Sequence, residues 1–160
     1  MGKRAGFTII EMLIVVAILA MLAGITSSLM EENQAKARDA KRAADLKILR
    51  AVLETHKIRT GSYPTTNGSW RGDCSAYGGY GYDNSGYIPG LVPSYLQSLP
   101  KDPGPAPSQA DAGYLYRSDG RDFKFIIHRT PDDYPPESPY FDPVRPYQAW
   151  QISTPNAYLW

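Results

Sequence analysis

The chain has 160 residues and a formal net charge of +1, from 17 lysine and arginine against 16 aspartate and glutamate side chains. This length allows one small domain with an appendage, and hardly two independent cores. The near-neutral charge argues against a nucleic-acid-binding protein that relies on bulk charge, and the single cysteine, Cys74, excludes an internal disulfide and a multi-cysteine zinc site.

Helix-breaking and aromatic residues are distributed unevenly along the chain. All 14 prolines, all 12 tyrosines and all three tryptophans follow Thr60, and only Gly2, Gly6 and Gly24 of the glycines precede it. We therefore predict a long N-terminal helix followed by a small head rich in turns.

Residues 7–30 form an apolar segment whose only charge is Glu11. As a helix, 24 residues extend about 36 Å, enough to cross a hydrocarbon layer of about 30 Å. The basic pair Lys3 and Arg4 precedes the segment, and no comparable basic cluster directly follows it. This pattern predicts a single-pass segment with the N-terminus in the cytoplasm and the head outside.

Two ordinary readings of this segment have to be weighed. A secretory signal peptide also combines a basic start with an apolar run, but a carboxylate inside the run is foreign to such signals, and no clear A-x-A cleavage site follows. A plain membrane anchor stays open, although it gives Glu11 no purpose.

Glu11 itself has two readings. An acidic residue in the first helical turn is favoured by the helix dipole. Alternatively, a cut after Gly6 would give Phe7 a new positive amine one helical turn from Glu11. In a bundle of such helices, amine and carboxylate of neighbouring chains could then neutralise each other. These physical arguments alone do not decide between a favourable first-turn acid and a partner for the Phe7 amine.

Residues 3–13, KRAGFTIIEML, resemble the processing site of type IV prepilins and type II secretion pseudopilins. That motif is a basic leader, a glycine, an aromatic residue with a glutamate four positions on, and an unbroken apolar helix. The resemblance implies that residues 1–6 are a leader, that prepilin peptidase cuts between Gly6 and Phe7 and methylates the Phe7 amine, and that Glu11 acts in filament assembly. A proline that many relatives carry near Ser28 is missing.

Residues 31–60 continue the helix with mixed charge, and Gly61 is a good helix stop. Apolar positions recur at threes, fours and their multiples, which predicts one amphipathic stripe that packs on a sheet. The charged residues on the remaining faces are expected to point to solvent or to neighbouring subunits. The stripe consists of Ala35, Ala43, Leu46, Leu49, Leu53 and His56.

Residues 61–160 are expected to form the exported head, with a loop region at 61–113 that includes a short helical turn at 91–99. In residues 114–160 we predict about three antiparallel strands and C-terminal loops. The first two, 114–118 and 121–128, flank an Asp119-Gly120 corner typical of a two-residue turn, and the third is 147–152. The predicted fold class is α+β and type IV pilin-like.

The segments Tyr63-Pro64-Thr65-Thr66 and Tyr95 to Pro103 also resemble the major pseudopilin of type II secretion. This resemblance extends over most of residues 7–127 and is absent beyond Arg129. The calcium-binding loop of that family has no recognisable counterpart. Asp132 and Asp133, with Glu137 and Asp142 nearby, are the calcium candidates, but regular ligand spacing is missing. We expect solvated loop charges there, and no cofactor.

No catalytic motif occurs, so an enzyme is not predicted. The alternative function is a membrane-anchored adhesin or carbohydrate-binding protein, because 15 tyrosine and tryptophan residues lie in the head. A plainer account is that these aromatics fill a small core. Cys74 is expected to be a small loop residue, with an intersubunit thiol as the other reading.

Taken with the resemblance, these features predict a structural subunit that polymerises into a type IV pilus-like or type II secretion pseudopilus filament. The partners implied are copies of itself, prepilin peptidase, membrane lipid before assembly, and a membrane assembly platform with minor pilins or pseudopilins. No nucleic acid is implied. The implied location is the cytoplasmic membrane, and then a periplasmic or extracellular filament. Secretion, adhesion, motility and DNA uptake all stay open as its purpose.

Overall fold

The structure is a computed structural model that describes residues 6–78, 86–105 and 108–160, without the side chains of residues 23–29. The leader residues 1–5, with Lys3 and Arg4, lie outside the described part. The chain divides into two compact units, residues 1–37 and 38–160.

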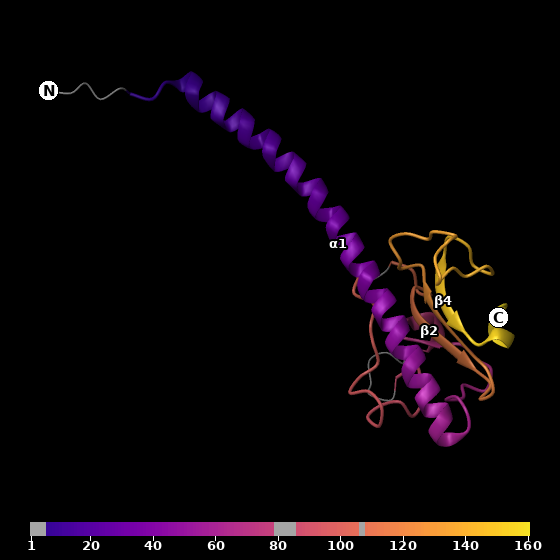
Figure 1. Ribbon diagram of the computed structural model, residues 1–160. Coiled ribbons are helices and arrows are strands. Elements are labelled where there is room, and N and C mark those ends of the chain that lie inside the picture. Colours follow the sequence, from indigo (N-terminus) through magenta and orange to yellow (C-terminus); the bar gives the residue numbers. More distant parts are fainter. Residues whose placement is uncertain (1–5, 79–85, 106–107) are drawn as a thin grey trace. The chain divides into compact units, whose positions relative to one another are not determined.

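One helix, α1 (Ile9–Thr60), contributes to both units (Figure 1). It begins two residues later than predicted and ends where predicted. Gly61 follows it with φ +85°, and the Gly61 amide donates to the Lys57 carbonyl oxygen at 2.8 Å. A left-handed glycine that takes up a late helical carbonyl is a common helix end. Within the residues described, we find no helix both long and apolar enough to cross a membrane.

The head contains a four-stranded antiparallel sheet of strand order β1-β2-β3-β4. The strands are β1 (Arg71–Gly72), β2 (Gly113–Ser118), β3 (Phe123–His128) and β4 (Ala149–Ser153), with short 3-10 helices at Ser75–Tyr77 and Pro155–Ala157. The prediction of a small antiparallel sheet is confirmed. The additional strand, β1, is two residues long, too short to produce an alternating pattern in the sequence.

The predicted two-residue turn between β2 and β3 is wrong. Ser118 pairs with Phe123, so four residues connect the strands. Asp119 explains the longer loop, because its Oδ1 accepts the amides of Arg121 and Asp122, each at 2.8 Å. The Asp119 amide still donates to the Asp122 oxygen at 3.3 Å, so the chain reverses at Gly120 and Arg121, one residue later than predicted. The helical turn expected at 91–99 is present as one turn, with the Tyr95 amide donating to the Leu91 oxygen.

The second half of α1 lies along one face of the sheet (Figure 1), and the core of the head is packed between the two. Leu46, Leu49 and Leu53 of the predicted stripe are fully buried. Aromatic side chains fill most of the remaining space. The interpretation that the tyrosines fill a small core therefore holds for these core residues. The three leucines pack with Tyr63, Tyr87, Tyr114, Tyr116, Phe123, Phe125, Ile127, Trp150 and Ile152.

Cys74 belongs to a second, smaller cluster with Leu115, Ile126 and Ala149. Its exposed fraction is 8%, and burial is the main reason that the pKa of its thiol is raised. A buried, protonated thiol is poorly placed to pair with another chain. The intersubunit reading of Cys74 therefore loses its support.

Asp73 is a carboxylate held inside the same region of the head. Its Oδ1 accepts the Tyr114 amide at 2.7 Å. Gly113 makes this approach possible, because a Cβ at that position would overlap the Asp73 carboxylate. Burial outweighs the hydrogen bond and raises the pKa of Asp73 to about 6.

We predict that Leu49→Ala lowers the free energy of unfolding by about 2–5 kcal/mol, because it leaves a cavity in the core. Ile48, the preceding residue of the same helix, is 50% exposed. Ile48→Ala is therefore the matched control, with an expected loss below about 1 kcal/mol. Urea unfolding of the full-length protein in detergent measures both, and equal losses would contradict the packing described.

Asp73→Asn should stabilise the head at neutral pH. The folded state holds the Asp73 proton more tightly than the unfolded chain, so the wild type loses stability as the pH rises from about 4 to 6. The amide of asparagine does not titrate and still accepts the Tyr114 bond. Urea unfolding should show the variant about 1–3 kcal/mol more stable at pH 7.5, and no such advantage at pH 4. Equal stability at pH 7.5 would refute a raised pKa.

Candidate functional site

Gly6 and Phe7, the predicted cleavage residues, lie just before α1. A Cβ added at Gly6 would meet no atom within 4 Å, and Phe7 is 69% exposed. The fold therefore places no packing demand on Gly6, and any requirement for glycine here must come from another molecule. The peptide bond between the two residues is open to an enzyme.

Thr8 and Glu11 form a capping box at the start of α1. The Thr8 amide and hydroxyl donate to Glu11 Oε2 at 2.8 and 2.7 Å, and the Glu11 amide donates to Thr8 Oγ1 at 3.3 Å. Such reciprocal bonds satisfy amides that the helix itself leaves unpaired. The sequence reasoning missed Thr8, although Thr-x-x-Glu before an apolar run is the signature of this cap. The bonds hold the Glu11 carboxylate beside the residues that follow the predicted cut.

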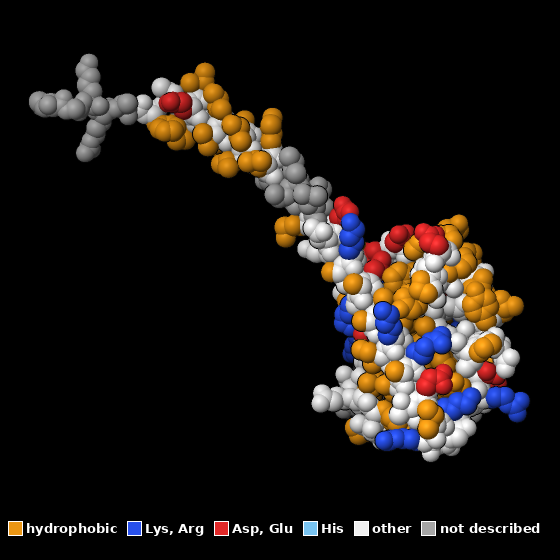
Figure 2. Space-filling model, viewed as in Figure 1, with side chains coloured by type: hydrophobic (Ala, Val, Ile, Leu, Met, Phe, Trp, Pro, Cys, Tyr) orange, Lys and Arg blue, Asp and Glu red, His pale blue; other side chains and the backbone are white. Residues whose placement is uncertain are grey.

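The surface of α1 after this cap is strongly apolar (Figure 2). Its large side chains from Ile9 to Leu22 are between 44% and 83% exposed, and they point to all sides of the helix. Water does not tolerate so large an uncovered apolar surface on a stable monomer. The exposed residues are Ile9, Ile10, Met12, Leu13, Ile14, Val15, Val16, Ile18, Leu19, Met21 and Leu22.

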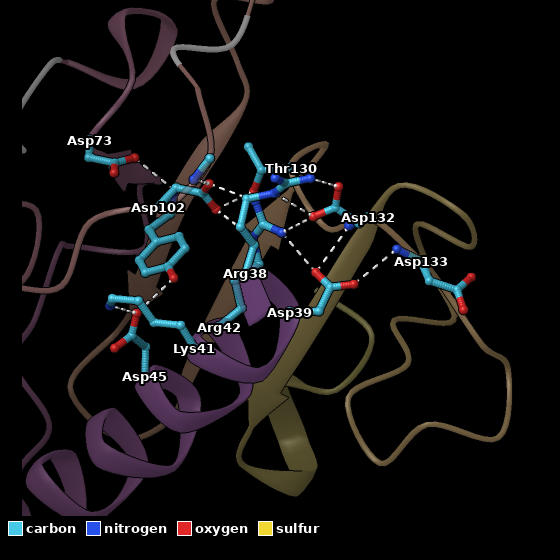
Figure 3. Close-up of polar contacts among 12 residues, drawn as sticks. Arg38, Asp39, Lys41, Arg42, Asp45, Asp73, Asp102, Thr130, Asp132 and Asp133 are labelled. Atoms are coloured by element: carbon cyan, nitrogen blue, oxygen red, sulfur yellow. Dashed lines mark hydrogen bonds and ion pairs between the residues drawn. The ribbon is translucent and has the colours of Figure 1, made fainter. Parts of the chain in front are cut away.

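The head holds a second polar centre, shown in Figure 3. Arg42 was expected on a solvated helix face, but its exposed fraction is only 1%. Its guanidinium donates to both oxygens of Asp102 at 2.8 Å, to Asp39 at 2.8 Å and to Asp132 at 2.7 Å. Burial of Arg42 is possible because these carboxylates satisfy its donors. The expectation failed because Asp102 and Asp132 lie 60 and 90 residues away in the chain.

We call Arg38, Asp39, Arg42, Asp102, Thr130 and Asp132 the Arg42 cluster. Arg38 donates to both oxygens of Asp132 at 3.0 and 2.6 Å, and this bond is the main reason that the pKa of Asp132 is lowered. Burial acts to raise the pKa of Asp102, but hydrogen bonds from Arg42 and Thr130 outweigh it and hold the pKa below its usual value. Both carboxylates are therefore ionised around neutral pH.

The calcium candidates do not combine into a metal site. Asp132 is bound to two arginines, while Asp133 Oδ1 accepts the Tyr134 amide at 2.8 Å. Across the described ranges, no group of three or more histidine, cysteine, aspartate or glutamate residues is arranged to hold a metal ion. The expectation of solvated charges is also wrong in part. Asp142 is fully buried and binds Lys124 at 3.1 Å and Arg145 at 3.2 Å.

Residues 1–27 match the family described as "Prokaryotic N-terminal methylation motif". The type II secretion system core protein G of Klebsiella pneumoniae is 31% identical over 103 residues, which cover 64% of this chain and 71% of that protein. The same protein of Escherichia coli K12 is 28% identical, covering 63% and 67%. That of Aeromonas hydrophila is 29% identical, covering 67% and 72%. No solved structure matches the chain.

A match of 103 residues is too long to lie within residues 1–60, so it reaches well into the head. The fold is α+β, with one long helix and a small antiparallel sheet. The chain belongs to the family of type II secretion system core protein G, the major pseudopilins.

Proposed function

We propose that this chain is a structural subunit that prepilin peptidase cuts between Gly6 and Phe7, and that then polymerises through α1 into a type II secretion pseudopilus. The observation that carries the proposal is the apolar surface from Ile9 to Leu22, which directly follows an accessible cleavage motif. A surface of this kind needs a cover, and lipid or the same surface of other copies provides one.

The order of events follows from what covers that surface. Before assembly, residues 7–30 lie in the inner membrane, residues 31–60 and the head at 61–160 lie outside, and the leader at 1–6 stays in the cytoplasm. Removal of the leader exposes the Phe7 amine, which is methylated. The helix then leaves lipid for contact with the helices of neighbouring subunits. A membrane assembly platform and minor pseudopilins are the further partners we infer for this transfer.

Glu11 is the only charge in the segment that makes this transfer. An uncompensated carboxylate in hydrocarbon costs on the order of 3 kcal/mol, and less near the interface. The capping bonds from Thr8 relieve part of this penalty within one chain. In the filament, the Phe7 amine of a neighbouring copy would neutralise the remaining charge, and so fix the axial register of the two helices.

The alternative of an aromatic-rich adhesin is less well supported. Tyr63, Tyr87, Tyr114 and Tyr116 are buried in the core of the head, so they are not available to a ligand. The relatives bear the name of a secretion system core protein. We infer that the chain has a structural role without catalysis.

Two substitutions of Glu11 separate its charge from its role as a cap. Glu11→Gln removes the charge, but glutamine still forms a capping box with Thr8. Glu11→Val removes both. We expect both variants to be inserted and cut like the wild type but to reduce filaments at least tenfold, counted by electron microscopy and by sheared protein.

The control is Glu32→Gln, which alters an exposed carboxylate on the same helix whose ion pair, among the residues described, is with the nearby Lys36. It should assemble normally. Wild-type filament levels in Glu11→Gln would mean that Glu11 acts as a cap alone and would contradict the pairing with Phe7.

A further inference from the structure

The segment after β3 is joined to β4 by a backbone bond from the Gln151 amide to the Tyr140 oxygen at 2.7 Å, whereas side chains of α1 connect it to the helix. Residues 130–146 contain six prolines and form no helix or strand. Their attachment to α1 is the Arg42 cluster, in which Arg38, Asp39 and Arg42 of the helix meet Asp132 of this segment and Asp102 of the preceding loop (Figure 3). One centre therefore joins the helix to two irregular loops.

In this cluster every carboxylate oxygen already accepts a hydrogen bond. Arg42 and the amides of Asp132 and Asp133 bind the two oxygens of Asp39. Arg42, Thr130 and the Gly104 amide bind those of Asp102. Arg38 and Arg42 bind those of Asp132. A calcium ion needs six to eight oxygen ligands, and here the oxygens face nitrogen and hydroxyl donors instead.

The position of the positive charge also argues against a calcium ion in this cluster. The Arg42 guanidinium lies where the three carboxylates converge, within 2.8 Å of an oxygen of each, and it is shielded from solvent. With Arg38, two positive charges face three negative ones. A cation could enter only by displacing a buried bidentate arginine, which is among the strongest charge-assisted contacts that proteins form.

The backbone around the cluster is adapted to the guanidinium. A Cβ at Gly104 would lie 2.9 Å from Asp102 Oδ1 and 3.0 Å from Arg42 Nη2. The absence of a side chain therefore lets this loop close tightly over the arginine. The Gly104 amide uses the close approach to donate to Asp102 at 2.8 Å.

We infer that the guanidinium groups of Arg42 and Arg38 fasten the C-terminal loop of this head in place of a calcium ion. The head of this family member is thus stable without calcium, although the major pseudopilins that it resembles carry a calcium-binding loop, which has no recognisable counterpart in this sequence. Arg42 is the main fastening residue, because it alone contacts all three aspartates.

The test is thermal unfolding of the full-length protein in detergent, with either excess chelator (EGTA) or millimolar calcium chloride. We expect the wild-type melting midpoint to agree within about 1 °C in the two buffers. Arg42→Met should lower the midpoint by about 10 °C in both, because it leaves buried carboxylates unpaired. Arg42→Lys keeps the charge but not the forked guanidinium, so its melting midpoint should lie between those of the wild type and Arg42→Met. This variant also covers the case in which Arg42→Met does not fold.

Arg50→Met is the matched control. Arg50 is an exposed arginine of the same helix that reaches one carbonyl oxygen, that of Ser153, at 3.3 Å. Amide hydrogen exchange of residues 130–146 should rise in Arg42→Met, and should not change in Arg50→Met or on chelation. A wild-type midpoint that falls by several degrees with EGTA would overturn the inference, as would an Arg42→Lys protein as stable as the control.

Discussion

The apolar surface at the start of α1 is the constraint on which the account depends. Large side chains surround the helix from Ile9 to Leu22, and each is far more exposed than a water-soluble protein allows for a contiguous surface. Further along the same helix, only one stripe is apolar, and Leu46, Leu49 and Leu53 bury it against the sheet. The second half of α1 therefore buries its apolar stripe within the chain, whereas the apolar side chains of the first half need other molecules to cover them.

The sequence predicted the long helix and its end at Thr60 because both are local properties. Proline is absent before Thr60, and the glycine after it is able to take the left-handed conformation. The hairpin strands were predictable from alternating and branched residues. Thr8 could have been identified with equal ease, since the capping box needs only a Thr-x-x-Glu spacing. The prepilin-type motif identified the candidate cleavage and assembly residues without any structure.

Contacts between distant residues were not predictable in the same way. Arg42 looks like one of many charges on an amphipathic helix, and only the folded head brings Asp102 and Asp132 to it. For the same reason Lys124 and Asp142 form a buried pair, although a charged residue in a proline-rich loop is usually solvated. A single sequence carries no record of such pairings, so it predicted the layers of the head better than the interactions that fasten its loops.

We propose that the apolar helix begins at a processed residue and is withdrawn from lipid by contact with its own copies. The decisive experiment is intact-mass and N-terminal mass spectrometry of the protein extracted from membranes and from sheared filaments. In both fractions we expect a chain that begins at Phe7 and carries one added methyl group. A native protein that keeps Met1, or one that starts beyond the apolar segment and stays monomeric in solution, would contradict it.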